Sequence, residues 1–384
     1  MKNYNCPQIK PIYPVYKLQD NLFRIGAQKG ITVEFGDTYN QLWELVNILD
    51  GRPIKEVIQI MQKKFPQLSA ENILEGVELL EKEGFVEEAC PEIETYSDRY
   101  KPNINYFSRY MDCSKNRCEI ESTINNSSIL LLGLGGGGSN ILTLLAGIGP
   151  KKIKIVDYDV IEEANLGRQL LYKEEDIGKL KTEIAKREIS KMNSEIEVEA
   201  YNLKITSEKD IAPLLEGIDI AICAIDEPPF LIQRIVNKAI VKASIPCVFG
   251  ASQVSRGRVF TVIPYETGCF DCLHIHYTKN DPKFILQFAG FSRISFNPPT
   301  IAYAPAIFQL TAAIVDEVVR VLTNYAPPRS LGTQFEINYE DGSSFRHPSW
   351  KRYPLECPTC GKGKESDWEV FSYYPYYELG EVDK

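Results

Sequence analysis

The stretch that decides the fold reads Ser128-Ile-Leu-Leu-Leu-Gly-Leu-Gly-Gly-Gly-Gly-Ser-Asn140, and later Lys154-Ile-Val-Asp-Tyr-Asp-Val-Ile-Glu-Glu-Ala-Asn-Leu-Gly-Arg-Gln169. The apolar run 129–132 has the length and composition of a buried parallel strand. It leads into a G-x-G-x-x-G pattern, and a helix over about 140–147 is expected to follow. Such glycines let the backbone approach a phosphate, and the helix N-terminus supplies free N–H donors. We call this turn the glycine loop; it contains Gly133, Gly135, Gly136 and Gly138.

A second strand, predicted over 153–156, ends in Asp157, where an acidic residue can bind a ribose hydroxyl. The context that the glycine pattern requires is therefore met on both sides. More polar side chains follow this strand, at the edge where ligands bind in open α/β sheets. They are Asp159, Asn165, Arg168 and Gln169.

Two further residues extend this candidate site. Lys181 belongs to the first turns of a helix expected over 176–193, and Asp226 ends a strand expected from residue 218. Arg168 and Lys181 are suited to neutralising a triphosphate, and Asp226 can hold Mg²⁺. Each residue alone is typical of a surface salt bridge, but together they indicate a triphosphate site. No His or Tyr stands out as the acid–base group of a dehydrogenase.

The bulk composition narrows the class of protein. The chain has 384 residues, is 44% hydrophobic and 25% charged, and carries a net charge of -9. These values are typical of a soluble globular protein of about two domains, and the acidic balance argues against a nucleic-acid partner. The sequence has neither a signal-peptide pattern nor an apolar run long enough to span a membrane. We therefore expect a cytoplasmic protein.

Residues 1–90 predict a first domain of the winged-helix type. Two strands around residues 19–20 and a third over 31–35 precede helices expected over 38–49, from residue 53, and over 70–83. A generic small domain would fit the pattern equally well. Since the acidic balance argues against DNA, a peptide bound at an exposed strand edge is the sharper hypothesis.

Residues 91–126 predict a linker with an approach helix, and residues 127–384 a doubly wound sheet. Helices are expected over 207–215 and 230–243, strands over 195–200 and 246–251, and an antiparallel extension over 256–264. The long apolar helix over 300–322 suggests burial in a subunit interface. The fold class is therefore α/β, with a smaller α+β domain at the N-terminus.

Ten cysteines include two C-x-x-C pairs, and these indicate metal binding in a reducing compartment rather than disulfides. The pairs are Cys269 with Cys272 and Cys357 with Cys360. Four thiolates predict a closed, structural Zn²⁺ site that ties the C-terminal tail to the middle of the domain. No cysteine lies between the pairs, so the thiol that usually accepts an activated acyl group is missing.

Together these motifs resemble the E1-like adenylating superfamily of ThiF, MoeB and the ubiquitin-activating enzymes. The resemblance covers about residues 95–361, and within the superfamily it is strongest to MccB-type and PaaA-type enzymes of peptide-antibiotic biosynthesis. Residues 1–90 resemble the PqqD-like leader-peptide recognition element. The family commonly has Arg-Tyr-x-Arg before the glycine loop, but here the segment is Arg99-Tyr-Lys-Pro102. Either Arg99 or Arg109 is expected to replace the second arginine.

The resemblance implies a homodimer that uses MgATP to adenylate a carboxylate of a ribosomally made precursor peptide. Asp157 would bind the ribose, Asn165, Arg168 and Lys181 the phosphates, and Asp226 the magnesium. Without a thioester, the acyl adenylate would be attacked directly, giving either internal glutamate-type cyclisation with dehydration or nucleotide conjugation. Two alternatives stay open: a sulfur-carrier adenylyltransferase of ThiF or MoeB type, and an inactive scaffold that only delivers a peptide.

Overall fold

The computed structural model describes residues 3–228, 231–291 and 300–373. The chain divides into two compact units, Met1–Thr123 and Ile124–Lys384, which we call the N-terminal and C-terminal units. Each unit has its own hydrophobic core. In the described part of the chain, no helix combines the length and the apolar character needed to cross a membrane.

The N-terminal unit contains two small antiparallel sheets. One has the order β2-β3-β4, with β2 at Val15–Gln19, β3 at Leu22–Ile25 and β4 at Val33–Gly36. The second pairs β1 (Pro7–Ile9) with β5 (Val86–Glu88). The sequence analysis predicted the β2–β3 hairpin but no strand at β1. A three-residue strand carries too little pattern to be recognised before its partner is known.

Three helices cover the N-terminal sheets: α1 (Gln41–Ile48), α2 (Ile54–Lys64) and α3 (Ala70–Lys82). Apolar side chains from each helix share one core with Phe23 and Ile25 of β3. Ser69 begins α3 with a capping box, because its side chain accepts from the Asn72 N–H. The unit thus combines strands and helices as the sequence predicted.

Residues 91–126 are more ordered than a simple linker. They form α4 (Lys101–Phe107), α5 (Arg117–Asn126) and two short 3₁₀ helices, Pro91–Thr95 and Ser108–Tyr110. A disulfide joins Cys90 to Cys118. The expectation that the cysteines outside the C-x-x-C pairs form no disulfide was therefore wrong. Residues 28 apart in sequence come together only through the path of the intervening chain, which the composition does not reveal.

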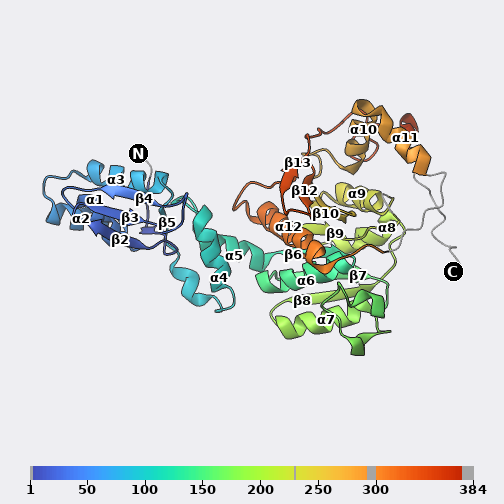
Figure 1. The fold of residues 1–384 in the computed structure, drawn as a ribbon, viewed down its shortest axis with the longest axis horizontal. Coiled ribbons are helices and arrows are strands. Elements are labelled where there is room, and N and C mark those ends of the chain that lie inside the picture. The colour runs from blue at the N-terminus through green and yellow to red at the C-terminus, as the bar shows by residue number, and fades with distance from the viewer. Residues whose placement is uncertain (1–2, 229–230, 292–299, 374–384) are drawn as a thin grey trace. The chain divides into compact units, whose positions relative to one another are not determined.

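The C-terminal unit is built on an eight-stranded sheet of order β13-β12-β11-β10-β9-β6-β7-β8 (Figure 1). The parallel strands are β6 (Ser128–Leu132), β7 (Lys152–Asp157), β8 (Glu197–Asn202), β9 (Ile220–Cys223) and β10 (Cys247–Ser252). The antiparallel extension consists of β11 (Arg256–Val262), β12 (Phe335–Asn338) and β13 (Ser344–Arg346). The predicted doubly wound fold class is confirmed, and strand order reverses between β6 and β9.

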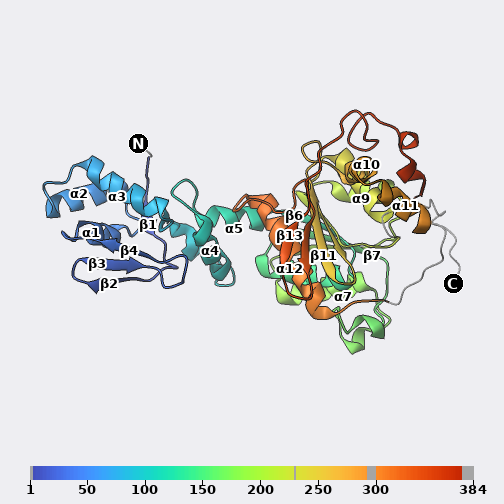
Figure 2. The same cartoon turned by 45° about the horizontal axis from the view of Figure 1, so that its top comes forward.

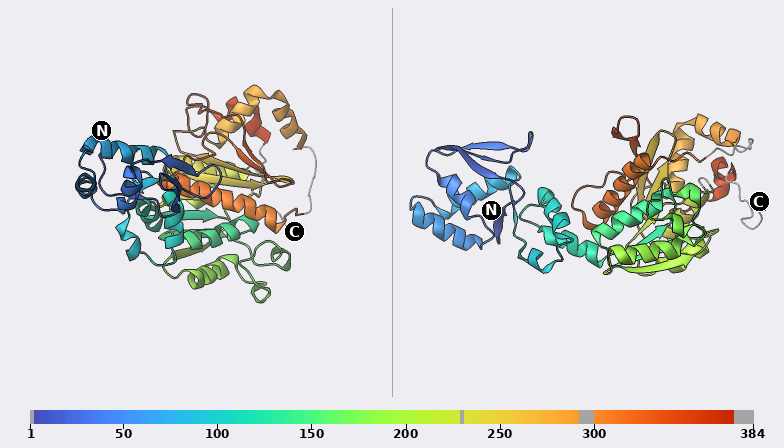
Figure 3. Two further views of the ribbon diagram at one scale, coloured as in Figure 1. Left: turned by 60° about the vertical axis from the view of Figure 1, so that its left-hand side comes forward. Right: turned by 60° about the horizontal axis from the view of Figure 1, so that its bottom comes forward.

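Helices cover both faces of this sheet (Figures 2 and 3). One face packs against α6 (Gly136–Ile148), α7 (Lys181–Met192) and α12 (Ala304–Thr323). The other packs against α8 (Glu208–Ile211), α9 (Leu231–Ala243) and α10 (Phe270–Asn280), with α11 (Pro282–Phe291) beyond α10. Alternate residues of β6 supply both cores, since successive side chains of a strand point to opposite faces.

Several predicted boundaries differ from the structure. Helix α7 begins at Lys181 rather than near residue 176, because Asp176 instead ends a 3₁₀ turn and binds Arg187. Helix α6 begins four residues early, inside the glycines. Helix α12 buries its apolar residues against β10, β11 and α6 of its own chain, so a subunit interface is not needed to explain them.

Candidate adenylation site and cysteine cluster

The glycine loop joins β6 to α6, and its geometry explains why it consists of glycines. Gly133 has φ +93°, a conformation that side chains disfavour. A Cβ on Gly138 would lie 1.8 Å from the Gly133 carbonyl oxygen, so the first turn of α6 packs directly on the loop. The first N–H groups of α6 have no acceptor within their own helix, as at any helix start. They form a suitable cradle for a phosphate.

Asp157, at the end of β7, stabilises the glycine loop through hydrogen bonds to the main chain. Its Oδ2 accepts from the Leu134 N–H at 2.6 Å, and its Oδ1 accepts from the Asp159 N–H at 2.8 Å. Asp159 in turn pairs with Lys181, whose Nζ lies 2.8 Å from Oδ2. Lys181 is 4% exposed, so its charge is held at the first turn of α7 beside this edge of the sheet. These three predicted residues are connected to one another.

The segment 165–169 lies against the glycine loop. A Cβ on Gly136 would be 3.4 Å from Cδ of Arg168, and one on Gly135 would be 4.0 Å from Nε2 of Gln169. Gln169 is 2% exposed, and no described residue offers a hydrogen bond to its Oε1. Asn165 is buried, and its Oδ1 accepts from the Glu162 N–H, which shapes the turn.

Asp226 follows β9 and lies near Arg168. Desolvation by the surrounding protein raises the pKa of the Asp226 carboxyl, while the Arg168 charge acts in the opposite direction. Asp226 as a whole residue is nevertheless exposed to solvent. The carboxyl ends of β6, β7 and β9 therefore carry the glycine loop, Asp157 and Asp226 on one edge, together with two cationic side chains. This arrangement is chemically suited to a nucleoside triphosphate with a divalent cation.

Two supporting residues of this edge were not predicted. Tyr172 donates from its hydroxyl to the Leu134 carbonyl at 3.1 Å, and Asn140 donates from Nδ2 to the Arg168 carbonyl at 3.1 Å. Both hold the loop and the segment 165–169 together. Neither has a sequence signal beyond proximity to the motif, because their partners are main-chain atoms.

Arg99 and Arg109, the two candidates for the family's second arginine, both belong to the N-terminal unit. Arg99 is exposed ahead of α4. Arg109 lies in the 3₁₀ helix Ser108–Tyr110, with its guanidinium 5.7 Å from the Tyr110 ring centroid. The choice between them stays a prediction.

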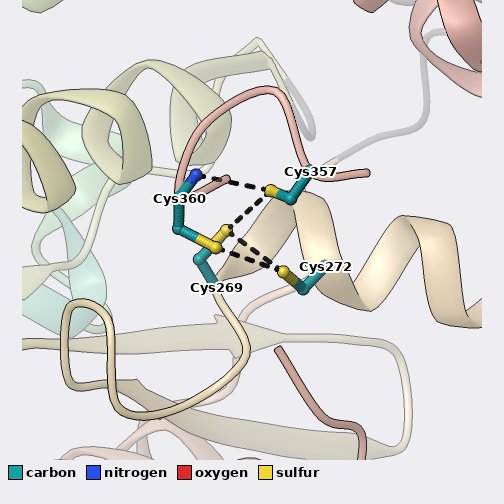
Figure 4. Close-up of side chains that lie close together, drawn as sticks. All are labelled: Cys269, Cys272, Cys357 and Cys360. Carbon is teal, nitrogen blue, oxygen red and sulfur yellow. Dashed lines mark hydrogen bonds between the residues drawn. The ribbon is translucent and has the colours of Figure 1, made fainter. Parts of the chain in front are cut away.

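The four cysteines of the C-x-x-C pairs come together as predicted (Figure 4). Their sulfur atoms lie within 4.8 Å of one another, and three of the spacings are 3.8, 3.5 and 3.4 Å. A tetrahedral zinc with bonds of about 2.3 Å has sulfur–sulfur edges of about 3.8 Å. All four side chains are buried and come from segments 88 residues apart. The donor set therefore fits a closed metal site that could hold zinc.

A polar network behind the cysteines links the two pairs. Asp271, inside the first pair, accepts from Arg234 Nε at 2.9 Å and from the hydroxyl of Thr359, inside the second pair, at 2.7 Å. His274 instead bonds the Phe270 carbonyl, and burial lowers its pKa to about 4. Asp271 was missed, since an acid between two cysteines has no distinctive pattern of its own.

Comparison with known proteins agrees with this geometry. The model of the ThiF family matches residues 107–359. The sulfur carrier protein ThiS adenylyltransferase of Bacillus subtilis is 29% identical over 255 residues, covering 66% of this chain and 69% of that protein. The sulfur carrier protein adenylyltransferase of Thermus thermophilus is 28% identical over 271 residues, covering 68% and 92%.

Solved structures share the fold over both units. Escherichia coli MccB with ATP has a TM-score of 0.72 and 24% identity, covering 92% of this chain and 99% of that one. PaaA has a TM-score of 0.66 and 19% identity, covering 88% and 99%. The family match, which covers more than half of the chain, decides the assignment. This chain belongs to the ThiF family and is an E1-like, ATP-dependent adenylating enzyme.

Proposed function

We propose that this enzyme adenylates a carboxylate of a ribosomally made precursor peptide that its N-terminal unit binds. The observation that carries the proposal is the N-terminal unit itself, most of which lies outside the ThiF match at 107–359. An adenylating enzyme that needed only a small carrier protein would have no evident use for it. MccB, which is similar over both units, has been solved with MccA and with N-formylated MccA.

A place for an extended peptide supports this proposal. Strand β4 is an edge of its three-stranded sheet, and an edge strand can pair with a peptide backbone. Beside it lies a hollow of about 270 Å³, lined by Val33 of β4, Glu83 after α3, Tyr13 and Arg109 among others. Apolar surface and both signs of charge would select side chains, while the strand edge would bind the main chain.

The chemistry would proceed at the carboxyl edge of the large sheet. A peptide carboxylate oxygen attacks the α-phosphorus of ATP, the bond to the β,γ-phosphates breaks, and pyrophosphate leaves. Arg168 and Lys181 would neutralise the phosphates, Asp157 would bind the ribose, and Asp226 would hold Mg²⁺. Asn165, Gln169 and the glycine loop would shape the phosphate cradle. The acyl adenylate would then react directly with a nucleophile of the peptide.

The proposal also includes a second copy of this chain, which would supply an arginine to the nucleotide site. The resemblance implies a homodimer in which Arg99 or Arg109 reaches the other copy's nucleotide. Sedimentation of the full chain should then give twice the chain mass of 43.6 kDa. A monomer that still adenylates its peptide would remove this part of the proposal and leave the peptide chemistry intact.

The first experiment is exchange of labelled pyrophosphate into ATP. Exchange should depend on a cognate peptide, encoded for instance by a neighbouring small reading frame. Lys181→Met and Asp226→Ala should lower it by about 100-fold or more, the loss typical of removing one charge-stabilising group. Peptide binding should not change. Glu175→Ala, an exposed acid outside the site, is the matched control and should exchange normally.

The second candidate is a sulfur-carrier adenylyltransferase, which the Bacillus and Thermus relatives favour. A sulfur-carrier protein and a precursor peptide are therefore compared as exchange substrates. Val33→Asp should abolish peptide-dependent exchange, whereas Tyr39→Asp, at an exposed tyrosine of the same unit, should not. The second candidate would be favoured if pyrophosphate exchange occurred with the carrier protein but not with the peptide, and if Val33→Asp did not affect it.

Mass spectrometry of the product then separates the two fates of the adenylate. A gain of one nucleotide monophosphate indicates conjugation, and a loss of water indicates cyclisation or dehydration.

A further inference from the structure

The disulfide of the N-terminal unit closes the whole segment that follows β5. Cys90 lies just after β5, and Cys118 lies in the first turn of α5. The two half-cystines pack with Tyr100 and Ile104 in a small core of their own. A second tether runs in parallel, because Arg117 Nη1 lies 2.7 Å from Oε1 of the buried Glu87.

A hollow of about 460 Å³ lies on one side of this disulfide and is open to solvent. Cys90 lines the hollow, and Cys118 is not among the lining residues. The carbonyl of Cys118 accepts from the Tyr96 hydroxyl at 3.2 Å, and both half-cystines are 4% exposed. A small molecule in the hollow would therefore approach the bond from the Cys90 side, with Cys118 as the group that leaves.

The lining of the hollow is acidic. Three acidic residues line it: Asp50, Glu88 and Glu92. Arg117 also lines it, but its side chain is buried and already pairs with Glu87. Oε2 of Glu88 is buried and lacks a hydrogen-bond partner among the described residues. Asp50 already pairs with Arg52, so a cationic ligand would pair with Glu88 and Glu92.

We propose that this hollow is a modification site at which a small aminothiol, positively charged at neutral pH, exchanges with the Cys90–Cys118 disulfide. The thiolate of the aminothiol attacks Sγ of Cys90 and forms a new sulfur–sulfur bond. The Cys90–Cys118 bond breaks, and its electron pair leaves on Sγ of Cys118, which takes a proton from solvent. One disulfide replaces another, so the step needs no oxidant or reductant beyond the thiol.

An external thiol is needed because the thiol of Cys6, which also lines the hollow, is a poor nucleophile. Burial, together with the nearby Glu88 and Glu56 carboxylates, raises the pKa of Cys6. Cys6 therefore stays protonated at neutral pH, and thiols react as thiolates. The same carboxylates would repel an anionic thiol and attract an amine.

Exchange would release the loop that the disulfide closes. Residues 91–117 would then be held to β5 by the Arg117–Glu87 pair, by the hydrogen bond from the Glu88 N–H to the Asp112 carbonyl, and by packing. Backbone amides of this segment should exchange with deuterium faster in the modified protein, and those of α1 to α3 should not change. This inference does not depend on the proposed reaction, because every residue it uses lies in the N-terminal unit.

The test uses the full chain with three probes: cysteamine, 2-mercaptoethanol and 3-mercaptopropionate. Free thiols are alkylated at intervals, and peptide mass spectrometry locates each adduct. At low salt cysteamine should form a mixed disulfide on Cys90, with Cys118 alkylated. Per thiolate, it should react about tenfold faster than 3-mercaptopropionate, as one opposite charge near two carboxylates implies. The neutral thiol should fall between, and 0.5 M salt should bring the three rates together.

Two neighbouring glutamates provide matched variants. Glu92→Gln removes a carboxylate of the hollow, whereas Glu94→Gln removes one that does not line it and pairs with Lys101. Glu92→Gln should lower the ratio of the cysteamine rate to the 3-mercaptopropionate rate, and Glu94→Gln should leave that ratio unchanged.

Three results would overturn the inference. Equal rates for the cationic and anionic thiols would mean that the hollow selects nothing. An adduct on Cys118 would mean that the bond is approached from the other side. Uptake of a second zinc ion by Cys90, Glu92 and Cys118 of the reduced chain, in place of any aminothiol adduct, would make the cluster a metal site.

Discussion

Neighbouring glycines of the glycine loop meet very different surroundings. Gly138 faces the main chain of Gly133, and an added Cβ would lie 1.8 Å from that carbonyl oxygen. A Cβ on Gly137 would have no heavy atom within 4 Å. Since main-chain atoms cannot move aside as a flexible side chain can, the same methyl group should have opposite effects at the two positions.

We therefore expect Gly138→Ala to lower the free energy of unfolding by about 3 kcal/mol, through overpacking of the loop against α6. Gly137→Ala, in the first turn of α6, should leave it unchanged or raise it by about 0.5–1 kcal/mol, because alanine favours a helix. Denaturant unfolding followed by circular dichroism measures both. Equal stability of the two variants would contradict the packing described for the loop.

At the scale of elements, the antiparallel end of the large sheet depends on one buried acid. Glu336 of β12 binds Arg256 and Arg258 of β11 and also His347, which follows β13. Burial alone would raise the pKa of Glu336, but Arg258 and the hydrogen bonds to Arg258 and His347 outweigh it and lower that pKa. The ionised carboxylate thus joins three adjacent strands.

A lowered pKa in the folded state stabilises the fold above the unfolded carboxyl pKa of about 4.3, and this contribution is lost as the pH falls below it. Glu336→Gln should lower the free energy of unfolding at pH 7 by about 2 kcal/mol, the scale of a charged hydrogen bond. It should also flatten the acid limb of the stability curve. Glu340→Gln, an exposed acid after β12, should change stability by less than about 0.5 kcal/mol. An unchanged acid limb in Glu336→Gln would rule out this role.

Strand and helix types were largely predictable from local pattern, whereas several boundaries were not. The β2–β3 hairpin, β6, β7 and α3 carry clear apolar periodicity or turn residues, and they form as expected. The start of α7 could not be predicted from the local sequence pattern. Asp176 looks like a helix-starting residue, but Arg187, which lies in the second turn of α7, binds it and holds it in the preceding turn.

For the whole molecule, the cysteine cluster joins α10 to a segment far along the chain. We expect one zinc per chain by elemental analysis. The double variant Cys357→Ala/Cys360→Ala should lose the metal and lower the melting temperature of the C-terminal unit, because metal binding contributes directly to folding. The N-terminal unit has its own core and should be unaffected. Cys223→Ala, a buried cysteine of β9 outside the cluster, should keep the zinc. A metal-free wild type of equal stability would refute the assignment.

The sequence by itself determined the doubly wound fold, the sheet edge at which the predicted site residues gather, and the pairing of the two C-x-x-C motifs. These depend on short-range patterns: a strand, its glycines and the acid after the next strand lie within thirty residues of one another. Only the tertiary structure decided that Cys90 pairs with Cys118, that Asp271 bridges both cysteine pairs, and that Asp159 holds Lys181. Such contacts depend on the path of the chain between their partners, which is set by the packing of whole elements and leaves no local signature.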